Sequence, residues 1–536
     1  MERSALLPPR RRTTGLAAVA ALALSTLPVG AAVAATSAQG CESRANITYD
    51  KLLECVTVDG VLAHEKALQA IADANGGNRA AGLPGYDASV DYVVDTLKAA
   101  GWQVRTETFP FTYVGPSILR QNSPVQANYA NNPATGTGYG DVTAAVQAVD
   151  LKLGLGNAST SGCEAADFAG FVAGNIALVQ RGTCPFADKA LNAEAAGASA
   201  VVIMNQGNTA APDRNDAVNP TLGGADVVDI PVVGTSYLSG VALSQAGSTA
   251  RVFVPQPESR PQENVIAELK GVNDDNVVMA GAHLDSVQAG PGINDNGSGS
   301  SALLELAENV RKLKPQNTIR LAWWGAEESG LIGSTQYVAG LSQAEKDRIA
   351  LYLNFDMVGS PNYIFMIYDG NESSWAAPAG VPIPEGSKQI EGLFESLYTK
   401  KGVPYDDAQF SGRSDYQAFI NNGIPAGGLF TGAEVVKTAQ QAQIWGGTAG
   451  QSYDPCYHQT CDDIDNLALD ALDVNSDVIS AAVLTYAYST ESVNGVKGTK
   501  VPGSYTLPAP AGPRKTVNLP GGGGLAHDHD HVGDVS

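Results

Sequence analysis

Hydrophobic and polar positions along the chain follow two patterns, which predict helices and strands in turn. Residues 59–75 and 86–101 carry apolar side chains at helical spacing, and glycines stop both runs. An alternating strand follows at residues 102–111. From Glu263 onward, apolar strands alternate with helical runs, in NVVMAGAH, ALLELAENVRKL, NTIRLAWWGAEE and RIALYLNFDMVGS. This alternation predicts an α/β fold with a largely parallel sheet.

A change in amino-acid composition divides the chain into parts. Residues 116–256 are rich in Ala, Gly, Asn and Thr, with short strand-like runs and almost no candidate catalytic groups. We interpret them as an inserted domain. Residues 36–115 hold an N-terminal segment and the start of the main domain, and residues 257–495 complete it. Residues 496–536, rich in Pro, Gly and His, predict a flexible tail.

Residues 1–35 have the pattern of a secretory signal peptide. They combine a basic start, a short apolar run and a small-residue Ala-Val-Ala ending. Because Pro28 and Gly30 break the apolar run, a retained membrane anchor is the weaker interpretation. The arginine cluster of the basic start leaves both the general and the twin-arginine export routes open. We expect a secreted, extracellular protein without a membrane segment once the signal is removed.

Composition, charge and cysteine content narrow the class of protein. Hydrophobic residues make up 44% of the chain and charged residues 16%, which is typical of a globular protein. The net charge of −22 argues against nucleic-acid binding, because phosphate contacts demand clustered Lys and Arg. An even number of cysteines in an exported chain favours disulfides. Their spacing suggests the pairs Cys41 with Cys55, Cys163 with Cys184, and Cys456 with Cys461.

Ionisable side chains gather where the predicted strands end, at the edge where open α/β sheets collect functional groups. An isolated carboxylate at a strand end is more often a helix cap or a salt-bridge partner. Two histidines with three or four carboxylates, however, have the composition of a two-zinc hydrolytic site. The strand-end and loop residues are His283, Asp285, Asp295, Glu327, Glu328 and Asp356.

Histidine is scarce, with six in the chain, and this narrows the choice of ligands. His64 lies on the first predicted helix, where we expect an exposed side chain. The three tail histidines stand in a segment too flexible to hold a closed metal geometry. His283 and His458 remain. A disulfide closing the short loop around His458 would hold it and the adjacent Tyr457 rigidly.

Five ordered motifs make the chain resemble the secreted di-zinc aminopeptidases of the Streptomyces type. They are AHLDS…GINDNGSG, WWGAEESGLIGS, LNFDMVGS, FSGRSDYQAFINNGIPAGGLFTGAE and YDPCYHQTCDD, and the likeness covers about residues 57–115 and 260–490. The insert resembles a protease-associated domain. The resemblance implies a three-layer zinc-exopeptidase fold with a mixed, mostly parallel central sheet, plus a small β-rich inserted domain.

The resemblance also implies two zinc ions and a ligand set for them. One ion would be bound by His283 and Asp356. The other would be bound by Glu328 and His458. Asp295 would bridge the two ions.

Catalytic and substrate-binding roles follow from the same resemblance. Asp285 would accept a hydrogen bond from the first zinc-binding histidine and fix its tautomer. Glu327 would be the general base, and Tyr457 would stabilise the oxyanion. Arg413 would contact the substrate backbone. The pocket for the first side chain would be lined by Met357, Gly412 and Phe430.

A structural calcium site is a further implication of the resemblance. Asp473 and Asp477 stand four apart on a predicted helix and share a face. With Asp59 and the carbonyl of Gly60, such a pair resembles the calcium site of the family. Two solvated helix carboxylates are the alternative.

With the family resemblance, these residues predict a zinc aminopeptidase that removes large hydrophobic, leucine-like residues from peptides with a free N-terminus, and we expect it to be a monomer. A carboxypeptidase of the same fold is the first alternative, but it needs a cationic pocket, and the region of Arg413 offers one arginine among apolar residues. A non-catalytic binding protein on this scaffold is the second, and the complete ligand set argues against it. The insert could shade the cleft, bind a partner or rigidify the fold.

Overall fold

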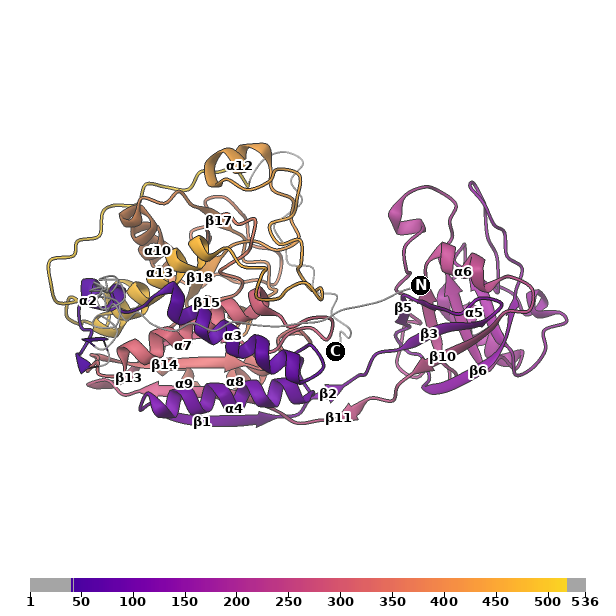
Figure 1. Ribbon diagram of the computed structural model, residues 1–536, viewed down its shortest axis with the longest axis horizontal. Helices are drawn as coiled ribbons and strands as arrows, with labels where there is room; N and C mark the ends of the chain where they lie inside the picture. The colour runs from indigo at the N-terminus through magenta and orange to yellow at the C-terminus, as the bar shows by residue number, and fades with distance from the viewer. Residues whose placement is uncertain (1–39, 42, 518–536) are drawn as a thin grey trace, which may run out of the picture. The chain divides into compact units, whose positions relative to one another are not determined.

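The structure, a computed structural model, describes residues 40–41 and 43–517 of the chain. Within these ranges the strands form two eight-stranded sheets and one two-stranded ribbon (Figure 1). The predicted signal peptide, residues 1–35, and the three tail histidines lie outside the described residues. In the part of the chain that the structure describes, no helix is both long enough and apolar enough to cross a membrane.

The first sheet is built from strands on both sides of the predicted insert, in the order β1-β12-β14-β13-β15-β18-β16-β17. Its four central strands, β14, β13, β15 and β18, run parallel, whereas β1 and β12 are antiparallel at one edge. The sheet is therefore mixed and mostly parallel, as predicted. The strands are β1 (Gln103–Phe109), β12 (Gln262–Leu269), β13 (Asn273–His283), β14 (Asn317–Trp324), β15 (Ile349–Phe355), β16 (Met366–Tyr368), β17 (Asp406–Ala408) and β18 (Ala426–Phe430).

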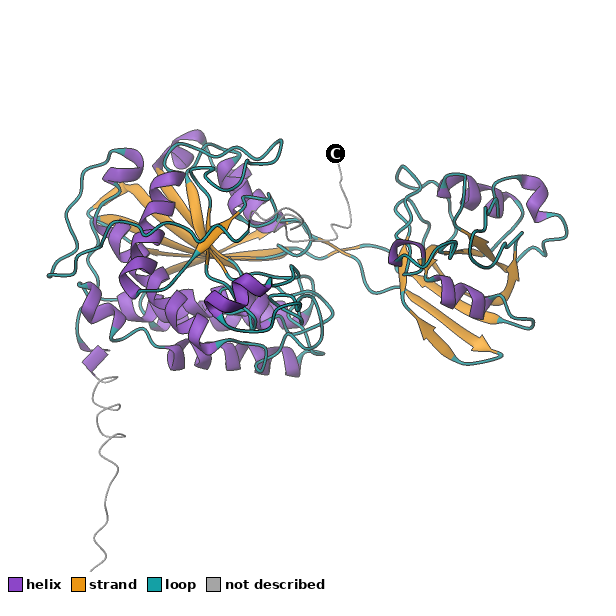
Figure 2. Ribbon diagram, turned by 90° about the horizontal axis from the view of Figure 1, so that it is seen from above, coloured by secondary structure: helices purple, strands orange, loops and turns teal. Residues whose placement is uncertain are grey.

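Two groups of helices cover this sheet and give the domain three layers (Figure 2). One group comprises α4, α7, α10 and α13, with α3 packed on α7 and α13. The other comprises α8, α9 and α11. The helices are α2 (Tyr49–Leu53), α3 (Val58–Ala74), α4 (Pro84–Ala99), α7 (Ser298–Val310), α8 (Ile332–Gly340), α9 (Gln343–Arg348), α10 (Ser387–Lys401), α11 (Tyr416–Ile420), α12 (Ala439–Trp445), α13 (Leu469–Tyr488) and α14 (Glu491–Asn494).

Local sequence signals fix the ends of the first long helices. The Thr57 hydroxyl accepts a hydrogen bond from a backbone amide of the first turn at 3.1 Å, so α3 begins at the next residue. Pro84 stands in the first turn of α4, where no helical hydrogen bond needs its missing amide. Gly101, with φ of 83°, follows α4 and turns the chain into β1. The predicted helices at 59–75 and 86–101 are confirmed.

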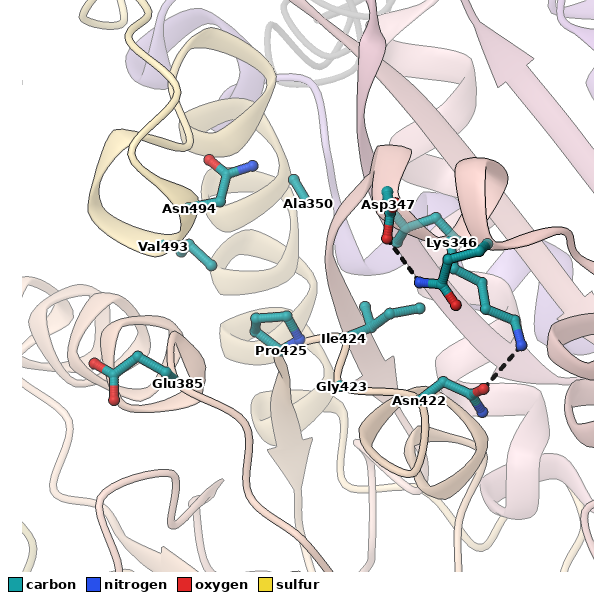
Figure 3. Close-up of a pocket in the computed structure, with 12 residues that line it drawn as sticks. Lys346, Asp347, Ala350, Glu385, Asn422, Gly423, Ile424, Pro425, Val493 and Asn494 are labelled. Carbon is teal, nitrogen blue, oxygen red and sulfur yellow. Dashed lines mark hydrogen bonds between the residues drawn. The ribbon is translucent and has the colours of Figure 1, made fainter.

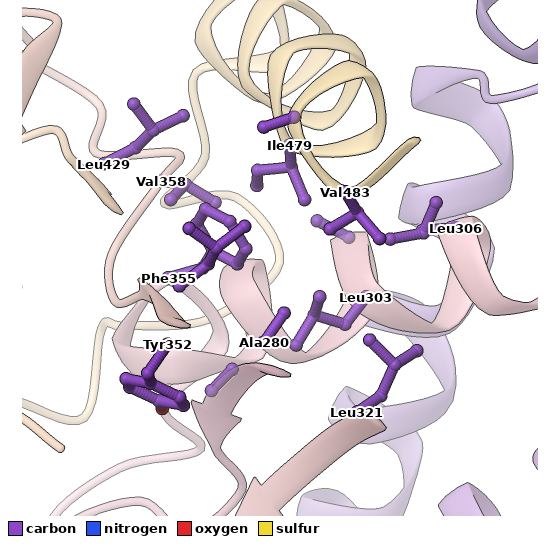
Figure 4. Close-up of a cluster of buried hydrophobic side chains, with 14 of the residues drawn as sticks. Ala280, Leu303, Leu306, Leu321, Tyr352, Phe355, Val358, Leu429, Ile479 and Val483 are labelled. Carbon is purple, nitrogen blue, oxygen red and sulfur yellow. The ribbon is translucent and has the colours of Figure 1, made fainter. Parts of the chain in front are cut away.

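The apolar faces of the helices and the sheet meet in one core (Figure 4). Leu303 of α7 and Ile479 and Val483 of α13 are all fully buried. Ala280 of β13 and Leu321 of β14 are buried in the same cluster. Each large apolar side chain buried in this way stabilises the fold by about 1.5–3 kcal/mol. The core therefore holds α7 and α13 against the central strands, whose carboxyl ends carry the ionisable residues.

The second sheet lies within the chain segment between β2 (Thr112–Tyr113) and β11 (Glu258–Ser259), which pair as a ribbon. Its order is β4-β3-β10-β6-β7-β8-β9-β5, and α5 and α6 pack on its strands. It is a β-rich domain inserted between β1 and β12, as predicted. Its elements are β3 (Ile118–Ser123), β4 (Ala127–Tyr129), β5 (Asn131–Pro133), β6 (Gly140–Ala148), β7 (Ile176–Gln180), α5 (Phe186–Ala195), β8 (Ala200–Met204), β9 (Val232–Thr235), α6 (Tyr237–Leu243) and β10 (Thr249–Val254).

All six cysteines are disulfide-bonded. One disulfide lies in the inserted domain and another in the loop before α13. Both pairings agree with the spacing of the sequence. They join Cys163 to Cys184 and Cys456 to Cys461, and Cys41 and Cys55 are disulfide-bonded as well.

The C-terminal segment differs from the predicted flexible tail. Residues 496–517 contain no helix or strand, yet their last part is tied to β17. The amide and the hydroxyl of Thr516 donate to the Asp406 carboxylate at 2.7 and 2.6 Å, and the Lys515 amide donates to the same carboxylate at 3.0 Å. Val517 is buried. A buried carboxylate of β17 thus holds the backbone of this part of the predicted tail.

Candidate metal centre

Three neighbouring strands bring ionisable residues to one edge of the first sheet. His283 is the last residue of β13, and Asp356 follows β15 directly. Glu327 and Glu328 lie just beyond the end of β14. Because β13 pairs in parallel with both β14 and β15, the carboxyl ends of the three strands lie side by side. The topology thus explains why residues so far apart in sequence meet.

Asp295 lies between the two histidines. Its Oδ1 is 3.2 Å from Nε2 of His283, and its Oδ2 is 3.3 Å from Nε2 of His458. The side chain is 3% exposed. One carboxylate therefore faces both imidazoles, one oxygen to each. This is the arrangement that a bridging ligand of two metal ions requires.

Each histidine has a second carboxylate beside it. Oδ1 of Asp356 is 3.3 Å from Nε2 of His283. Oε2 of Glu328 is 3.1 Å from Nε2 of His458. A ligand atom of Glu327 also lies within 4.8 Å of those of His283 and Asp356. Two overlapping groups of nitrogen and oxygen donors therefore share one buried space.

The donor set fits zinc better than calcium or magnesium. Zinc prefers imidazole nitrogen with carboxylate oxygen at about 2.0–2.2 Å, so two ligands of a tetrahedral ion stand about 3.4 Å apart. The histidine–carboxylate separations at this centre, from 3.1 to 3.3 Å, are close to that value. Four buried carboxylates facing two imidazoles also demand positive charge. The residues fit a pair of zinc ions in number, type and spacing.

The electrostatics of the centre favour a cation. Burial and the Glu328 carboxylate push the pKa of Asp295 up, but hydrogen bonds from both histidines outweigh them and hold it at about 2. Burial lowers the pKa of His458, but its carboxylate neighbours have the larger, opposite effect and raise the pKa to about 11. Burial raises the pKa of Glu327 well above its ordinary value. The centre thus holds positive charge strongly.

A disulfide and a ring stack hold the loop that carries His458. The disulfide between Cys456 and Cys461 closes it, and the Tyr457 ring stacks on the His458 ring with centroids 3.8 Å apart. His458 also adopts a positive φ of 58°, a conformation that non-glycine residues rarely take and that clusters at functional sites. The structure thus places Tyr457 directly beside a candidate ligand.

Asp285 contacts both His283 and the backbone that carries the two glutamates. Nδ1 of His283 lies 3.1 Å from the backbone carbonyl oxygen of Asp285 and 3.8 Å from its carboxylate. The carboxylate also accepts hydrogen bonds from the amides of Glu327 and Glu328, at 3.1 and 3.3 Å. Asp285 thus faces Nδ1 of His283 through its backbone carbonyl, with its carboxylate at ion-pair distance. The carbonyl can still fix the tautomer, leaving Nε2 free to bind metal.

Two further residues position the candidate ligands, although sequence reasoning missed them. Asp462 accepts the amides of Asn294 and Asp295 at 2.9 and 3.0 Å, which fixes the loop of the bridging carboxylate. Ser414 donates its hydroxyl to Oδ2 of Asp356 at 2.6 Å. Both stand inside motifs already recognised, CDD and SGRSD. Their position in those motifs was the signal that could have revealed them.

Arg79 is a third residue that the sequence did not indicate. Its guanidinium is fully buried and donates to three backbone carbonyls of residues 284–292. This segment leads from the end of β13 to the bridging Asp295, and we call it the metal loop. Nε bonds Pro291 at 2.9 Å, Nη2 bonds Gly292 at 2.6 Å, and Nη1 bonds Leu284. Because the contacts are to backbone atoms, no side-chain pattern in the sequence reveals them.

The predicted substrate-binding residues occupy loops and strand ends at the same edge of the sheet. Met357 follows Asp356 directly and has a positive φ of 53°, and Phe430 ends β18, the strand beside β15. Both are buried. Gly412 has a φ of 87° that suits glycine, and it precedes Arg413 in the loop before α11. Their roles in binding substrate stay predictions.

The structure gives a different explanation for the predicted calcium ligands. Asp477 forms an ion pair with Lys401, Nζ to Oδ2 at 2.5 Å, so a lysine supplies the positive charge expected of calcium. Among the described residues, the close groups of histidine and carboxylate ligands do not include Asp59, Asp473 or Asp477. Gly60 instead lies against the carboxylate of Glu305.

His64 corrects an expectation. It is 6% exposed rather than solvated, and its Nδ1 lies 2.6 Å from the hydroxyl of Tyr92. The periodicity of the helix could not show this, because α4 and α7 cover that face of α3.

A pocket of about 300 Å³ lies at the opposite edge of the first sheet (Figure 3). Lys346 and Asp347 of α9, Ala350 near the start of β15 and Pro425 just before β18 line it. These residues stand at the amino ends of the parallel strands, and none of them is a predicted site residue. Ligand sites of open α/β sheets lie at the carboxyl ends.

Comparison with known proteins gives the family. The model of peptidase family M28 matches residues 264–483, and the PA domain model matches residues 142–243. An aminopeptidase of Pseudomonas aeruginosa (strain UCBPP-PA14) is 49% identical over 452 residues, or 83% of either chain. The chain belongs to peptidase family M28. The M28 protein is accordingly a peptide hydrolase with an inserted PA domain, and the M28 match contains all six donors of the candidate metal centre.

More distant relatives agree with this assignment. Leucine aminopeptidase 2 of Trichophyton rubrum is 36% identical to the M28 protein over 475 residues, covering 87% of this chain and 92% of the relative. The structure of a zinc aminopeptidase from Bacillus subtilis superposes with a TM-score of 0.57 at 25% identity, covering 80% of this chain and 94% of that one. The three-layer fold expected from the sequence is confirmed.

Proposed function

We propose that this M28 peptidase is a secreted two-zinc aminopeptidase that removes large hydrophobic residues from the N-termini of peptides. The observation that carries the proposal is the bridging position of Asp295, with one oxygen 3.2 Å from His283 and the other 3.3 Å from His458. The relatives named as aminopeptidases support the N-terminal polarity.

Five residues would hold the two zinc ions. His283 and Asp356 would bind one ion, and Glu328 and His458 the other. Asp295 would bridge them. Zinc bound there would lower the pKa of a water molecule and polarise the scissile carbonyl.

Glu327 would act as the general base. Its carboxylate lies with His283 and Asp356, and burial raises its pKa well above the ordinary value. A carboxylate with a raised pKa accepts a proton more readily near neutral pH. Glu327 would take a proton from the attacking water and deliver it to the leaving amine. Tyr457, held against His458, would donate a hydrogen bond to the developing oxyanion.

Polarity and side-chain preference follow from the charges and apolar groups at this edge. The carboxylates beside the metals would bind the free amine of the substrate, while Arg413 would contact its backbone. Met357 and Phe430, both buried, offer apolar contacts to the first side chain. Secretion is supported by the disulfides, which persist in oxidising compartments. The monomeric state stays a prediction.

The test is a Glu327→Gln variant assayed on leucyl peptides and on peptides with acidic C-terminal residues, with bound zinc counted. We expect zinc to stay bound and leucyl hydrolysis to fall by about 10²–10⁴-fold. Glu385→Gln, a change at a highly exposed carboxylate, is the matched control and keeps full activity. Cleavage restricted to C-terminal residues would refute the polarity. Full activity of Glu327→Gln, or of wild type after chelation, would refute the mechanism.

A further inference from the structure

A second group of metal-ligand side chains lies between α3 and α7. His64 comes from α3, and Glu305 and Glu308 come from α7, where residues three apart share a face. One ligand atom from each lies within 4.8 Å of the other two. The donors of the candidate zinc centre meet the same proximity condition. The group shares none of its residues with that centre.

His64 is oriented as a ligand would be. Its Nδ1 lies 2.6 Å from the Tyr92 hydroxyl, and its other ring nitrogen, Nε2, lies on the side of the Glu308 carboxylate. The distance from Nε2 to Oε2 of Glu308 is 3.7 Å. That separation is an ion-pair distance, and it is also close to the roughly 3.4 Å between two ligands of one tetrahedral zinc ion. An outer partner on the second ring nitrogen is also what metal-bound histidines have.

Glu305 adds a buried carboxylate that needs positive charge. It is 6% exposed, and burial raises its pKa to about 7. One oxygen accepts the Thr57 amide at 3.1 Å. The carboxylate lies against Gly60, where an added Cβ would come within 2.4 Å of it. The absence of a side chain at that position leaves the space that Glu305 occupies.

We propose that His64, Glu305 and Glu308 bind a zinc ion at a site separate from the catalytic centre. One imidazole nitrogen and two carboxylate oxygens are zinc ligands, and water would complete four-coordination. The ion would tie α3 to α7, the helix that begins just after the loop of the bridging Asp295. The inference rests on its own residues and does not depend on the proposed aminopeptidase function.

The test counts zinc by mass spectrometry on the full secreted chain after dialysis. We expect His64→Ala and Glu308→Gln each to bind one zinc fewer than wild type. Asp73→Asn is the matched control, because it removes an exposed carboxylate of α3 that accepts a hydrogen bond from its neighbour Gln69, and it keeps the wild-type zinc content. Equal zinc content in wild type and His64→Ala would overturn the proposal.

A second measurement separates this site from the catalytic centre. A His283→Ala/His458→Ala variant, titrated with Co²⁺, should still show the visible absorption of one tetrahedral ion. Adding His64→Cys to it should keep the ion and introduce a sulfur charge-transfer band, which remains informative if His64→Ala fails to fold. If the catalytic centre binds no zinc, the His283→Ala/His458→Ala variant binds as many zinc ions as wild type, while His64→Ala still binds one fewer. No absorption in either variant would refute the site.

Discussion

Replacing Arg79 tests whether the metal loop is held by a buried guanidinium. Arg79 is fully buried and donates to the carbonyls of Leu284, Pro291 and Gly292. In Arg79→Met the apolar stem is retained, but the three carbonyls lose their donor. The buried Glu65 carboxylate also loses the neighbouring positive charge. The variant therefore perturbs the loop that leads to Asp295 without touching a proposed ligand.

The size of the effect follows from burial. A hydrogen bond to a charged group contributes about 1.5–3 kcal/mol, and removing one partner of a buried charged pair costs about 3–5 kcal/mol. We expect Arg79→Met to lower the free energy of unfolding by about 3–5 kcal/mol. Arg79→Lys keeps the charge but not the planar fork, so it should recover only part of that loss. Zinc affinity should fall by about 10–100-fold, as for other residues that orient ligands.

Urea unfolding of the metal-free chain measures the stability, and competition with a chelator measures the zinc affinity. Arg251→Met is the matched control, since Arg251 pairs with Asp141 through two hydrogen bonds of 2.7 Å and both side chains are partly exposed to solvent. Exposed ion pairs contribute little, so its stability should stay close to wild type. If Arg79→Met unfolds like Arg251→Met and binds zinc like wild type, the guanidinium does not hold the loop.

Three further predictions concern other parts of the fold. Ser414→Ala removes the 2.6 Å hydrogen bond to Asp356, and zinc affinity should fall by about tenfold in the same chelator assay. Burial raises the pKa of Asp407 to about 7, so its protonation stabilises the folded chain at low pH, and this stability is lost as pH rises from about 4 to about 7. The free energy of unfolding, measured with urea at several pH values in that range, should depend less steeply on pH in Asp407→Asn than in wild type. An unchanged pH dependence would contradict the role of Asp407. A Cys456→Ser/Cys461→Ser variant frees the His458 loop and should raise the zinc dissociation constant; wild-type affinity would show that the disulfide is dispensable.

The strand-end donors could be predicted from sequence because they depend on topology. Once strands alternate with helices, parallel pairing forces the ends of β13, β14 and β15 to one edge, and His283 and Asp356 must lie near each other. Periodicity alone does not bring His458 there, since it lies in a remote loop without regular structure. Its inclusion came from the scarcity of histidine and from the family resemblance.

Except for the hydroxyl of Ser414 on Asp356, the contacts that were missed involve the backbone or the packing between helices. Asp462 and Arg79 bond main-chain atoms, and main-chain positions depend on the folded loop rather than on residue types. The burial of His64 depends on how α3 meets α4 and α7, which helical periodicity does not contain. The 3.1 Å distance from Nδ1 of His283 to the Asp285 carbonyl oxygen likewise depends on the folded backbone.

Two aspartates hold the backbone of the centre in the same way. Asp285 accepts the consecutive amides of Glu327 and Glu328, and Asp462 accepts those of Asn294 and Asp295. Each therefore fixes the main chain beside a proposed ligand. The two carboxylates are buried, and burial raises the pKa of both. Each carboxylate accepts hydrogen bonds from two amides, and these bonds stabilise its ionised form. The two ionised aspartates then add negative charge beside a centre that already holds four carboxylates. The proposed pair of zinc ions would offset that charge, so the two aspartates that orient the ligands would also increase the affinity of the site for metal.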